Sequence, residues 1–326
     1  MILTTDFPTL TQKLNEWFNE AASLAVEGWI GAQLFDVGET NWQTYNGLIL
    51  NGAAKFDRVS EGAQLPVGSI SEGDSMSISQ KRYGGRISIS KDMRMFDRYD
   101  QIEEVTKDNV QFAFDRIDQS QADLLLNGFT GTSYTDVYGY TQSNVCADGV
   151  VFFSASHTNN QNANTARNLI RNAAGTANPA LDRAAIVTAR KDAKINRDPN
   201  NANRPVNLDR LIVSATNEDL AERTVYSSGV AGTPNVDLNP LKGKISNILV
   251  WSRCDTSGQA ADTSAYWFLA DSRFSKKTLK SPFAQKPMMV PPTQVHDSLN
   301  WEYPLDSYYT LGLLWPFGVW GATGAN

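Results

Sequence analysis

The sequence is poor in the residues from which most metal and redox sites are built. Among its 326 residues there are two cysteines, Cys146 and Cys254, and two histidines, His157 and His296. Two cysteines cannot make a disulfide framework, and their spacing fits no zinc motif. So few histidines exclude a histidine-rich metal centre. The scarcity of cysteine favours a reducing compartment such as cytosol.

Long apolar runs and an excess of positive charge are also missing. The longest apolar stretch, residues 311–322, is short and broken by Gly312 and Pro316, so we expect no membrane span. The 29 basic and 35 acidic residues give a net charge of −6, which argues against a general nucleic-acid binder but not against a local basic face. Because 41% of the residues are hydrophobic, the chain can still bury a core, in two domains or one large irregular domain.

Motifs for catalysis and cofactor binding are absent as well. There is no phosphate-binding glycine loop, no zinc-protease helix and no calcium loop. Cys146 and His157 lie eleven residues apart in an expected loop, which is weak support for a cysteine nucleophile. Asp115, Asp118 and Asp123 occupy mixed faces of an expected helix, which favours a solvated or inter-subunit face over an acid–base pair. We therefore expect no enzyme and no catalytic, cofactor-binding or metal-binding residues.

The first strong pattern is an amphipathic helix at residues 8–27. Leu10, Leu14, Ala21 and Leu24 recur at helical spacing together with two aromatic residues. Two placements are open: an ordinary helix facing the core, or an arm that lies on a neighbouring subunit. For the second placement, the contact candidates are Trp17 and Phe18.

Residues 53–90 predict a long β-hairpin. Residues 75–79 and 86–90 alternate apolar with small polar side chains, and Gly84 and Gly85 between them predict a turn or bulge. An isolated ribbon is marginally stable in water, so we expect it to lie on another chain, where its basic residues would meet acidic faces such as that of the long helix. The alternative is the edge of a larger sheet. The candidate contact residues on the ribbon are Glu61, Gly62, Leu65, Pro66, Lys81, Arg82 and Arg86.

A long helix at about residues 98–127 is the strongest local signal. Its apolar residues form one broad stripe, and about 30 residues at 1.5 Å each would span about 45 Å. We expect Phe112 and Ile117 to pack against a sheet.

The remaining chain predicts a mixed α/β block followed by an aromatic tail. Residues 130–180 are expected to be loop with one short strand at 149–154. Aromatic residues from Tyr266 onward indicate cores and interfaces. The expected helices of the block are 181–195 and 217–225, and its expected strands are 208–214 and 245–251.

One basic cluster stands out near residue 275. Four cations lie close together there and are candidates for a patch that faces DNA phosphates, although a solvated face is the commoner explanation. The cluster consists of Arg273, Lys276, Lys277 and Lys280.

The order of these segments resembles a known family. Residues 59–66, Val-Ser-Glu-Gly-Ala-Gln-Leu-Pro, precede the alternating strands, and residues 86–92, Arg-Ile-Ser-Ile-Ser-Lys-Asp, lead into the long helix. This order resembles the extended loop and spine helix of tailed-bacteriophage major capsid proteins. Residues 148–159 resemble the loop after the spine helix in the Mu-type major head subunit, and residues 308–321 look like the family's closing strand.

The resemblance implies an α+β fold of the tailed-phage major capsid type, which encapsulin shells share. It covers about residues 50–321 and depends on the order of the segments, not on one specific motif. The implied parts are an N-terminal arm (1–45), an extended β-hairpin loop (53–90), a peripheral domain (91–149 and 269–306) with a spine helix at about 98–127, and an axial domain (150–268 and 307–326).

The implied function is that of a major capsid protein of a tailed double-stranded DNA phage or prophage. The chain would assemble as homo-pentamers and homo-hexamers into an icosahedral head in the host bacterial cytoplasm, and its location would be the virion. Implied partners are a portal, decoration proteins and DNA held by weak, non-specific contact, but no membrane. Because the first helix begins almost at once, we expect any scaffold to be a separate protein. The alternatives are an encapsulin-like compartment and, remotely, a cysteine hydrolase.

Overall fold

A computed structural model describes residues 7–51, 58–68, 71–96, 99–157, 167–196, 205–229, 238–256, 262–295 and 300–325. The chain divides into two compact units. Unit 1 consists of Met1–Tyr45, Ile78–Ala122 and Ser281–Leu311, and unit 2 consists of Asn46–Ser77, Asp123–Lys280 and Gly312–Asn326. Both units contain helices and strands, as the expected α+β class requires. None of the described helices is long and apolar enough to cross a membrane.

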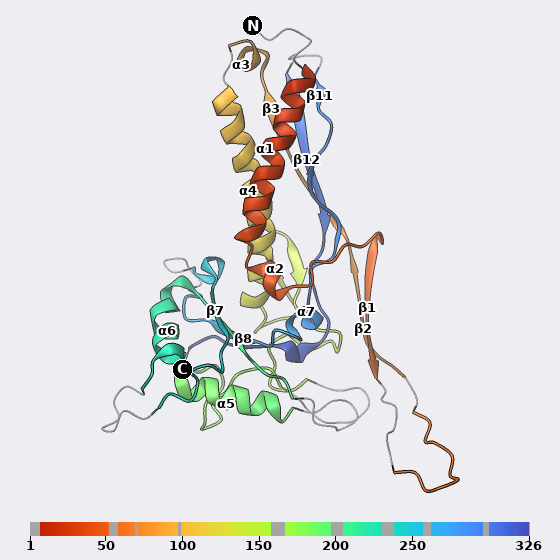
Figure 1. The fold of residues 1–326 in the computed structure, drawn as a ribbon, viewed down its shortest axis with the longest axis vertical. Coiled ribbons are helices and arrows are strands. Elements are labelled where there is room, and N and C mark those ends of the chain that lie inside the picture. Colours follow the sequence, from red (N-terminus) through yellow and green to blue (C-terminus); the bar gives the residue numbers. More distant parts are fainter. Residues whose placement is uncertain are drawn as a thin grey trace. The chain divides into compact units, whose positions relative to one another are not determined.

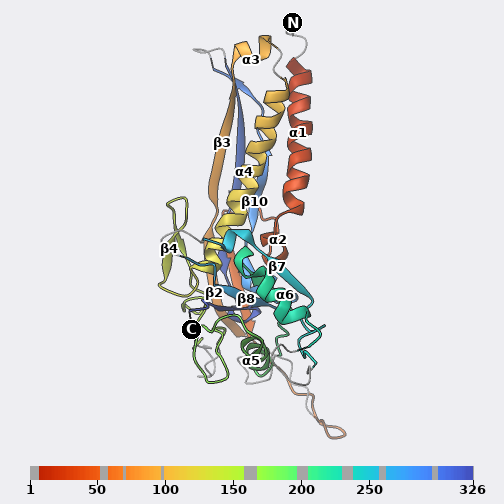
Figure 2. The same ribbon diagram turned by 90° about the vertical axis from the view of Figure 1, so that its left-hand side faces the viewer.

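Unit 1 is built from helices against one antiparallel sheet (Figures 1 and 2). Strand β12 is central, with β3 on one side and with β10 and β11 on the other. The elements are α1 (Phe7–Glu27), α2 (Gly31–Leu34), β3 (Lys81–Ile89), α3 (Lys91–Met95), most of α4 (Tyr99–Leu126), β10 (Phe283–Met289), β11 (Thr293–Gln294) and β12 (Trp301–Tyr309).

Helices α1 and α4 lie side by side, and both expected helices are confirmed within one residue at each end (Figure 1). Phe18 of α1 packs with Val110, Phe114 and Ile117 of α4 in one core cluster. Lys107 of α4 also forms an ion pair with Glu20 of α1 at 2.9 Å. The described part of α1 is therefore a core-facing helix of its own unit, the first of the two placements.

The apolar stripe of α4 differs in phase from the expected one. Ile117 is 1% exposed and packs in the core, but Phe112 is 67% exposed, so the expectation that Phe112 packs against the sheet is wrong. Two polar residues take part in the buried stripe instead. Thr106 donates its hydroxyl proton to the carbonyl oxygen of Ile102 at 2.7 Å, and the side-chain oxygen of Gln121 accepts a hydrogen bond from Trp29 Nε1 at 2.7 Å.

The expected ribbon has different arms from those that the alternation indicated. Its two strands are β1 (Thr44–Asn51) and β2 (Ser71–Ser79), which form a two-stranded sheet. Residues 86–90 belong to β3 and its end, and β3 pairs along its whole length with β12. Gly84 and Gly85 are therefore neither a turn nor a bulge but interior residues of β3, opposite Asp306 and Leu305. A Cβ atom on Gly84 would lie 3.0 Å from the carbonyl oxygen of Leu305, which explains the glycine there.

Unit 2 has a four-stranded sheet in the order β14-β8-β6-β7, in which β6 and β7 are parallel. Its other pairs are β4 with β5 and β9 with β13, and most of the β1–β2 pair also belongs to this unit. The elements are β4 (Ser133–Thr135), β5 (Thr141–Ser143), α5 (Arg183–Lys194), β6 (Arg210–Val213), α6 (Glu218–Tyr226), β7 (Asn247–Val250), β8 (Trp267–Ala270), α7 (Ser275–Thr278), β9 (Leu279–Lys280), β13 (Gly312–Leu313) and β14 (Val319–Ala322), with 3-10 turns η2 (Ala215–Asn217), η3 (Ser252–Cys254) and η4 (Pro316–Gly318).

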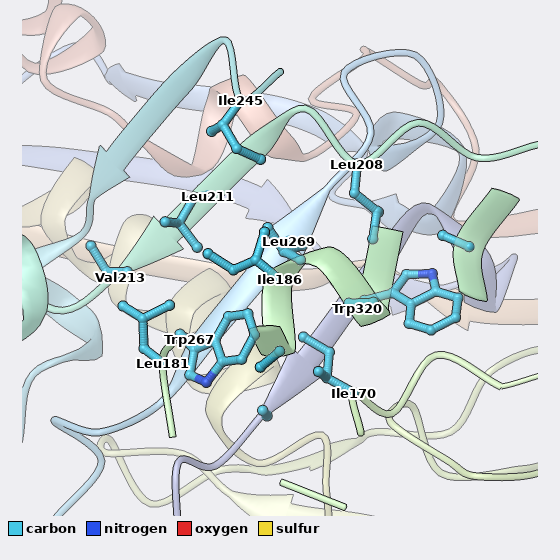
Figure 3. Close-up of a cluster of buried hydrophobic side chains, with 14 of the residues drawn as sticks. Ile170, Leu181, Ile186, Leu208, Leu211, Val213, Ile245, Trp267, Leu269 and Trp320 are labelled. Atoms are coloured by element: carbon cyan, nitrogen blue, oxygen red, sulfur yellow. The ribbon is translucent and has the colours of Figure 1, made fainter. Parts of the chain in front are cut away.

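The core of unit 2 lies between this sheet and α5. Figure 3 shows Ile186 of α5 beside Leu211 of β6 and Leu269 of β8, with two large indole rings below them. The rings belong to Trp267 and Trp320, and both are buried. The helices and strands expected over residues 181–251 are confirmed. The strand expected at 149–154 is not, because in that segment the described residues form a single bridge, between Val145 and Val151.

Candidate subunit-contact surfaces

The loop between β1 and β2 carries the most exposed of the expected contact residues. Leu65 is 75% exposed, the neighbouring Val67 is 90% exposed, and Pro66 between them is partly buried. Ahead of them, Gly62 adopts φ +77°, a backbone conformation that glycine adopts without strain, and Ala63 N donates to the Ser60 carbonyl oxygen at 3.0 Å. A turn thus sets the course of the loop at Glu61 and Gly62 and leaves two branched apolar side chains in solvent.

The basic residues of the ribbon are placed differently from expectation. Arg82 forms a two-pronged ion pair with Asp306 of β12, and Arg86 pairs with Glu302 of β12 at 2.9 Å. The hydrogen bond to Asp306 raises the pKa of Arg82, with a further contribution from the carboxylate charge. These cations meet carboxylates of their own sheet, which corrects the expectation that they await an acidic neighbour. Lys81 is exposed at the start of the same strand.

The two aromatic residues proposed on the first helix have different surroundings. Phe18 is 8% exposed in the core between α1 and α4, so it presents little surface to a neighbouring subunit. Trp17 is partly buried against a second cluster that includes Ile87, Ile102 and Tyr303. Packing in the core of unit 1 therefore accounts for the apolar side chain of Phe18 fully and for that of Trp17 in part.

The basic cluster is only partly available to an anion. Arg273 pairs with the buried carboxylate of Asp271 at 3.2 Å, and this interaction raises the pKa of the guanidinium. Lys276 and Lys277 are exposed on α7, and Lys280 is half-buried. The ammonium group of Lys277 lies 5.5 Å from the centre of the Phe274 ring, a cation–π contact. Two exposed lysines therefore remain as candidates for contact with phosphate.

The residues considered for catalysis are buried or form hydrogen bonds that stabilise the fold. Burial raises the pKa of the Cys146 thiol well above its ordinary value, and the charge of Asp148 adds to the effect. His157 is bonded to Asp148, not to Cys146. Asp118 accepts a hydrogen bond from Gly31 N at 3.0 Å, and Asp123 accepts one from Val137 N at 3.2 Å. Asp118 and Asp123 are buried within the subunit, so the solvated or inter-subunit face expected for them is wrong, whereas Asp115 is partly exposed.

The sequence reasoning missed two sets of exposed apolar residues. Trp42, just before β1, is 75% exposed. Val137, Tyr138 and Tyr140 are exposed in the turn between β4 and β5, where the Asp136 carboxylate accepts hydrogen bonds from the backbone nitrogens of Tyr138 and Tyr140. An exposed tryptophan and a rigid aromatic turn are typical of protein interfaces. Their loops lack any periodic pattern that would have identified them.

The described residues thus combine a sheet with two long helices in unit 1, a four-stranded sheet in unit 2 and loops that expose apolar side chains. A family model described as phage capsid protein matches residues 73–290, which is well over half of the chain. The chain therefore belongs to the phage capsid protein family. It is a major capsid protein that assembles with copies of itself into the shell of a phage particle, the virion.

Solved structures show the same fold at low sequence identity. The capsid of Myoviridae phage XM1 matches with a TM-score of 0.50 at 13% identity, over 88% of this chain and 89% of that one. The capsid of cyanophage P-SCSP1u matches with a TM-score of 0.52 at 14% identity, over 90% and 87%. A phage-related protein from Bordetella bronchiseptica RB50 matches with a TM-score of 0.53 at 12% identity, over 94% and 96%. No curated protein matches the sequence significantly.

Proposed function

We propose that this capsid protein forms homo-pentamers and homo-hexamers that tile an icosahedral head around the double-stranded DNA of a tailed phage of the Mu-type branch. Rings follow when one surface patch of a subunit meets a different patch of the next and the rotation closes. The observation that carries this proposal is the β1–β2 loop, which exposes Leu65 and Val67 in a chain with a well-formed core elsewhere.

We assign the two units to the two domains of such a subunit. Unit 1, with most of α4 and the sheet around β12, is proposed as the peripheral domain, and the α/β part of unit 2 as the axial domain. This assignment moves residues 123–149 and 269–280 from the expected peripheral domain to the axial one, and residues 307–311 from the expected axial domain to the peripheral one. Residues 53–90 lose β3 to the peripheral sheet, so the proposed extended loop is β1, β2 and the residues between them.

The loop tip is proposed to bind a neighbouring subunit through its apolar residues. Fully burying a leucine or valine side chain contributes about 1.5–3 kcal/mol, so two such residues supply a useful part of a subunit contact. Glu61 and Gly62 set the turn, and Pro66 restricts the backbone between the two apolar residues. Arg82, Arg86, Trp17 and Lys81 belong to unit 1 and are proposed for a separate contact with a neighbouring subunit, in which both guanidinium groups are already paired within the chain.

Changing the tip separates assembly from folding. Leu65→Asp and Val67→Asp should leave the melting temperature of unassembled subunits unchanged, because both side chains are already in water. The same variants should fail to form closed shells in negative-stain electron microscopy. Leu65→Met, which keeps the apolar surface, is the matched control and should assemble. Normal shells from both aspartate variants would show that the loop tip is not part of the interface between subunits.

The remaining partners follow from the same shell. DNA is proposed to meet the exposed Lys276 and Lys277 weakly, with Lys280 and the paired Arg273 as secondary contacts, because the chain is acidic overall. A portal and separate scaffold or decoration proteins are proposed as further partners, and no catalytic role is proposed. Extraction of purified particles should give double-stranded DNA. A protein cargo in its place would favour an encapsulin-like compartment.

A further inference from the structure

A buried histidine in unit 2 lies at the junction of three chain segments. His157 is 1% exposed and follows the paired phenylalanines Phe152 and Phe153. Its Nδ1 atom lies 2.7 Å from Oδ2 of Asp148, whose side chain is itself 4% exposed. Its Nε2 atom lies 3.0 Å from the carbonyl oxygen of Phe152 and 3.1 Å from Oδ1 of Asn168.

The orientation of the Asn168 amide is fixed by the backbone around it. Its Nδ2 group donates to the carbonyl oxygens of Phe152 at 2.7 Å and Pro316 at 2.8 Å, and its Oδ1 accepts from the backbone nitrogen of Ser154 at 3.0 Å. Rotating the amide would place its oxygen against two carbonyl oxygens and its NH₂ group against an N–H. The atom that faces His157 is therefore an oxygen, an acceptor.

Both ring nitrogens of His157 consequently face acceptors only. A neutral imidazole has one N–H donor and one lone pair, and here that lone pair would point at a carbonyl or carboxylate oxygen inside the protein. An imidazolium donates from both nitrogens and satisfies every partner. We propose that Asp148, Asn168 and the Phe152 carbonyl hold His157 as a buried imidazolium. The additional ring proton of the imidazolium then acts as a latch: it fastens the 146–157 loop, through Asn168, to the C-terminal segment at residues 316–321.

The hydrogen bonds of Asp148 favour its charged form. Its Oδ1 atom accepts from the backbone nitrogen of Val150 at 3.1 Å, and its Oδ2 atom faces His157. Asp74 of β2 and the Cys146 thiol are the other titratable groups beside it. From the C-terminal side, the ring of Phe317 meets the imidazole edge-on at 5.8 Å between centroids and carries no charge. Asp148 is thus the one carboxylate bonded to the ring among the described residues. A buried carboxylate is stable when it is paired and hydrogen-bonded.

The latch joins segments that lie far apart in the sequence. The backbone of Asn168 accepts from Gly321 N at 3.2 Å, and Ile170 N donates to the Gly321 carbonyl oxygen at 2.9 Å. The Asn168 side chain also binds the Pro316 carbonyl oxygen. Loss of the proton from Nε2 would leave its lone pair facing two acceptors, the Phe152 carbonyl oxygen and Asn168 Oδ1. The repulsion would weaken the attachment of η4 and β14 to the Asn168 segment. The inference concerns folding within one subunit and does not depend on the proposed subunit contacts.

Histidine-selective ¹⁵N labelling read by NMR on the folded protein, assembled or not, tests the proton directly. His296 lies outside the described residues, and a His296→Gln background leaves His157 as the single signal source. At about pH 8, above the ordinary histidine pKa of about 6.5, both ring nitrogens should still give protonated signals. One protonated and one bare nitrogen at that pH would overturn the proposal.

Asp148→Asn tests the counter-charge. In this variant His157 should show a bare ring nitrogen at about pH 8, whereas Asp219→Asn, an exposed change on α6, should keep both protonated signals. The melting temperature of Asp148→Asn should lie below that of the parent, because the variant loses the counter-charge of the imidazolium. Protonated nitrogens that persist in Asp148→Asn, or an unchanged melting temperature, would contradict the latch. If Asp148→Asn does not fold, the parent spectrum alone decides.

Discussion

Arg82 and Asp306 form a two-pronged ion pair across β3 and β12, in which Nε donates to Oδ1 at 2.9 Å and Nη2 to Oδ2 at 3.0 Å. The two residues are 224 positions apart in the sequence. The pair fixes the register of β3 on β12, with Arg82 opposite Tyr308 and Asp306 opposite Gly84. A segment that resembled a free ribbon is thereby joined to the sheet of unit 1.

A double-mutant cycle should detect the coupling of this pair. Arg82→Ala and Asp306→Ala should each lower the melting temperature, and the double variant should lose less than the sum because both single variants already break the same interaction. The coupling should shrink at high salt, since the Arg82 side chain is largely exposed. Arg86 and Glu302, treated in the same way, are the matched comparison. Strictly additive losses at low salt would show that the pair contributes nothing.

Two aspartate substitutions on α4 should have opposite outcomes. Ile117→Asp should reduce the free energy of unfolding by about 3–5 kcal/mol, because it places a charge in the core between α1 and the sheet. Phe112→Asp, on the exposed face of the same helix, should change it by no more than about 0.5 kcal/mol. Urea unfolding of unassembled subunits measures both. Equal losses would mean that the burial pattern of α4 is wrong.

Tryptophan truncation should separate core from surface in the same manner. Trp320→Ala removes a buried indole ring from the core of unit 2 and should reduce the free energy of unfolding by about 3–5 kcal/mol. Trp42→Ala removes an exposed ring and should leave subunit stability within about 0.5 kcal/mol. Thermal unfolding followed by circular dichroism reports both. A large loss for Trp42→Ala would show that its ring is covered within the folded subunit.

Cys146 should resist alkylation in the folded protein. Burial, together with the charge of Asp148, raises the pKa of its thiol, so the reactive thiolate stays scarce through neutral pH and increases only in alkaline solution. Iodoacetamide labelling read by mass spectrometry should modify Cys146 in denaturant and spare it in native buffer at about pH 7.5. Cys146→Ala should assemble normally. Rapid native labelling would revive the cysteine-nucleophile hypothesis.

Local patterns predicted the helices and several strands because these elements depend on neighbours in the sequence. The 3.6-residue spacing located α1 and α4, and Asp182 caps the start of α5 by accepting a hydrogen bond from Ala185 N. The predicted position of the buried face of α4 was wrong because Thr106 and Gln121 are polar yet buried. Each has a hydrogen-bond partner within unit 1. The bond of Thr106 is local, to Ile102 one turn earlier, whereas Gln121 is bonded by Trp29, 92 residues away in the sequence, and periodicity reports neither bond.

The candidate contact surfaces were partly predictable for the same reason. Leu65 and Pro66 were candidates because they lie in the expected ribbon, and the structure places both in the loop between β1 and β2, with Leu65 exposed. The partners of Arg82 and Arg86 could not be found, because β12 follows them by more than 200 residues and carries its carboxylates among aromatic residues. Trp42 and the β4–β5 turn gave no signal, since their exposure depends on surrounding loops.

Strand β14 has a consequence for the timing of synthesis. It lies at one edge of a sheet that β6 and β8 begin, and its Trp320 fills the core beneath them. A nascent chain on the ribosome cannot close unit 2 until residues 319–322 have emerged, although unit 1 has by then received all of its strands. Subunits still under translation should therefore not polymerise prematurely. Chaperones would bind them while unit 1 is folded and unit 2 is still incomplete.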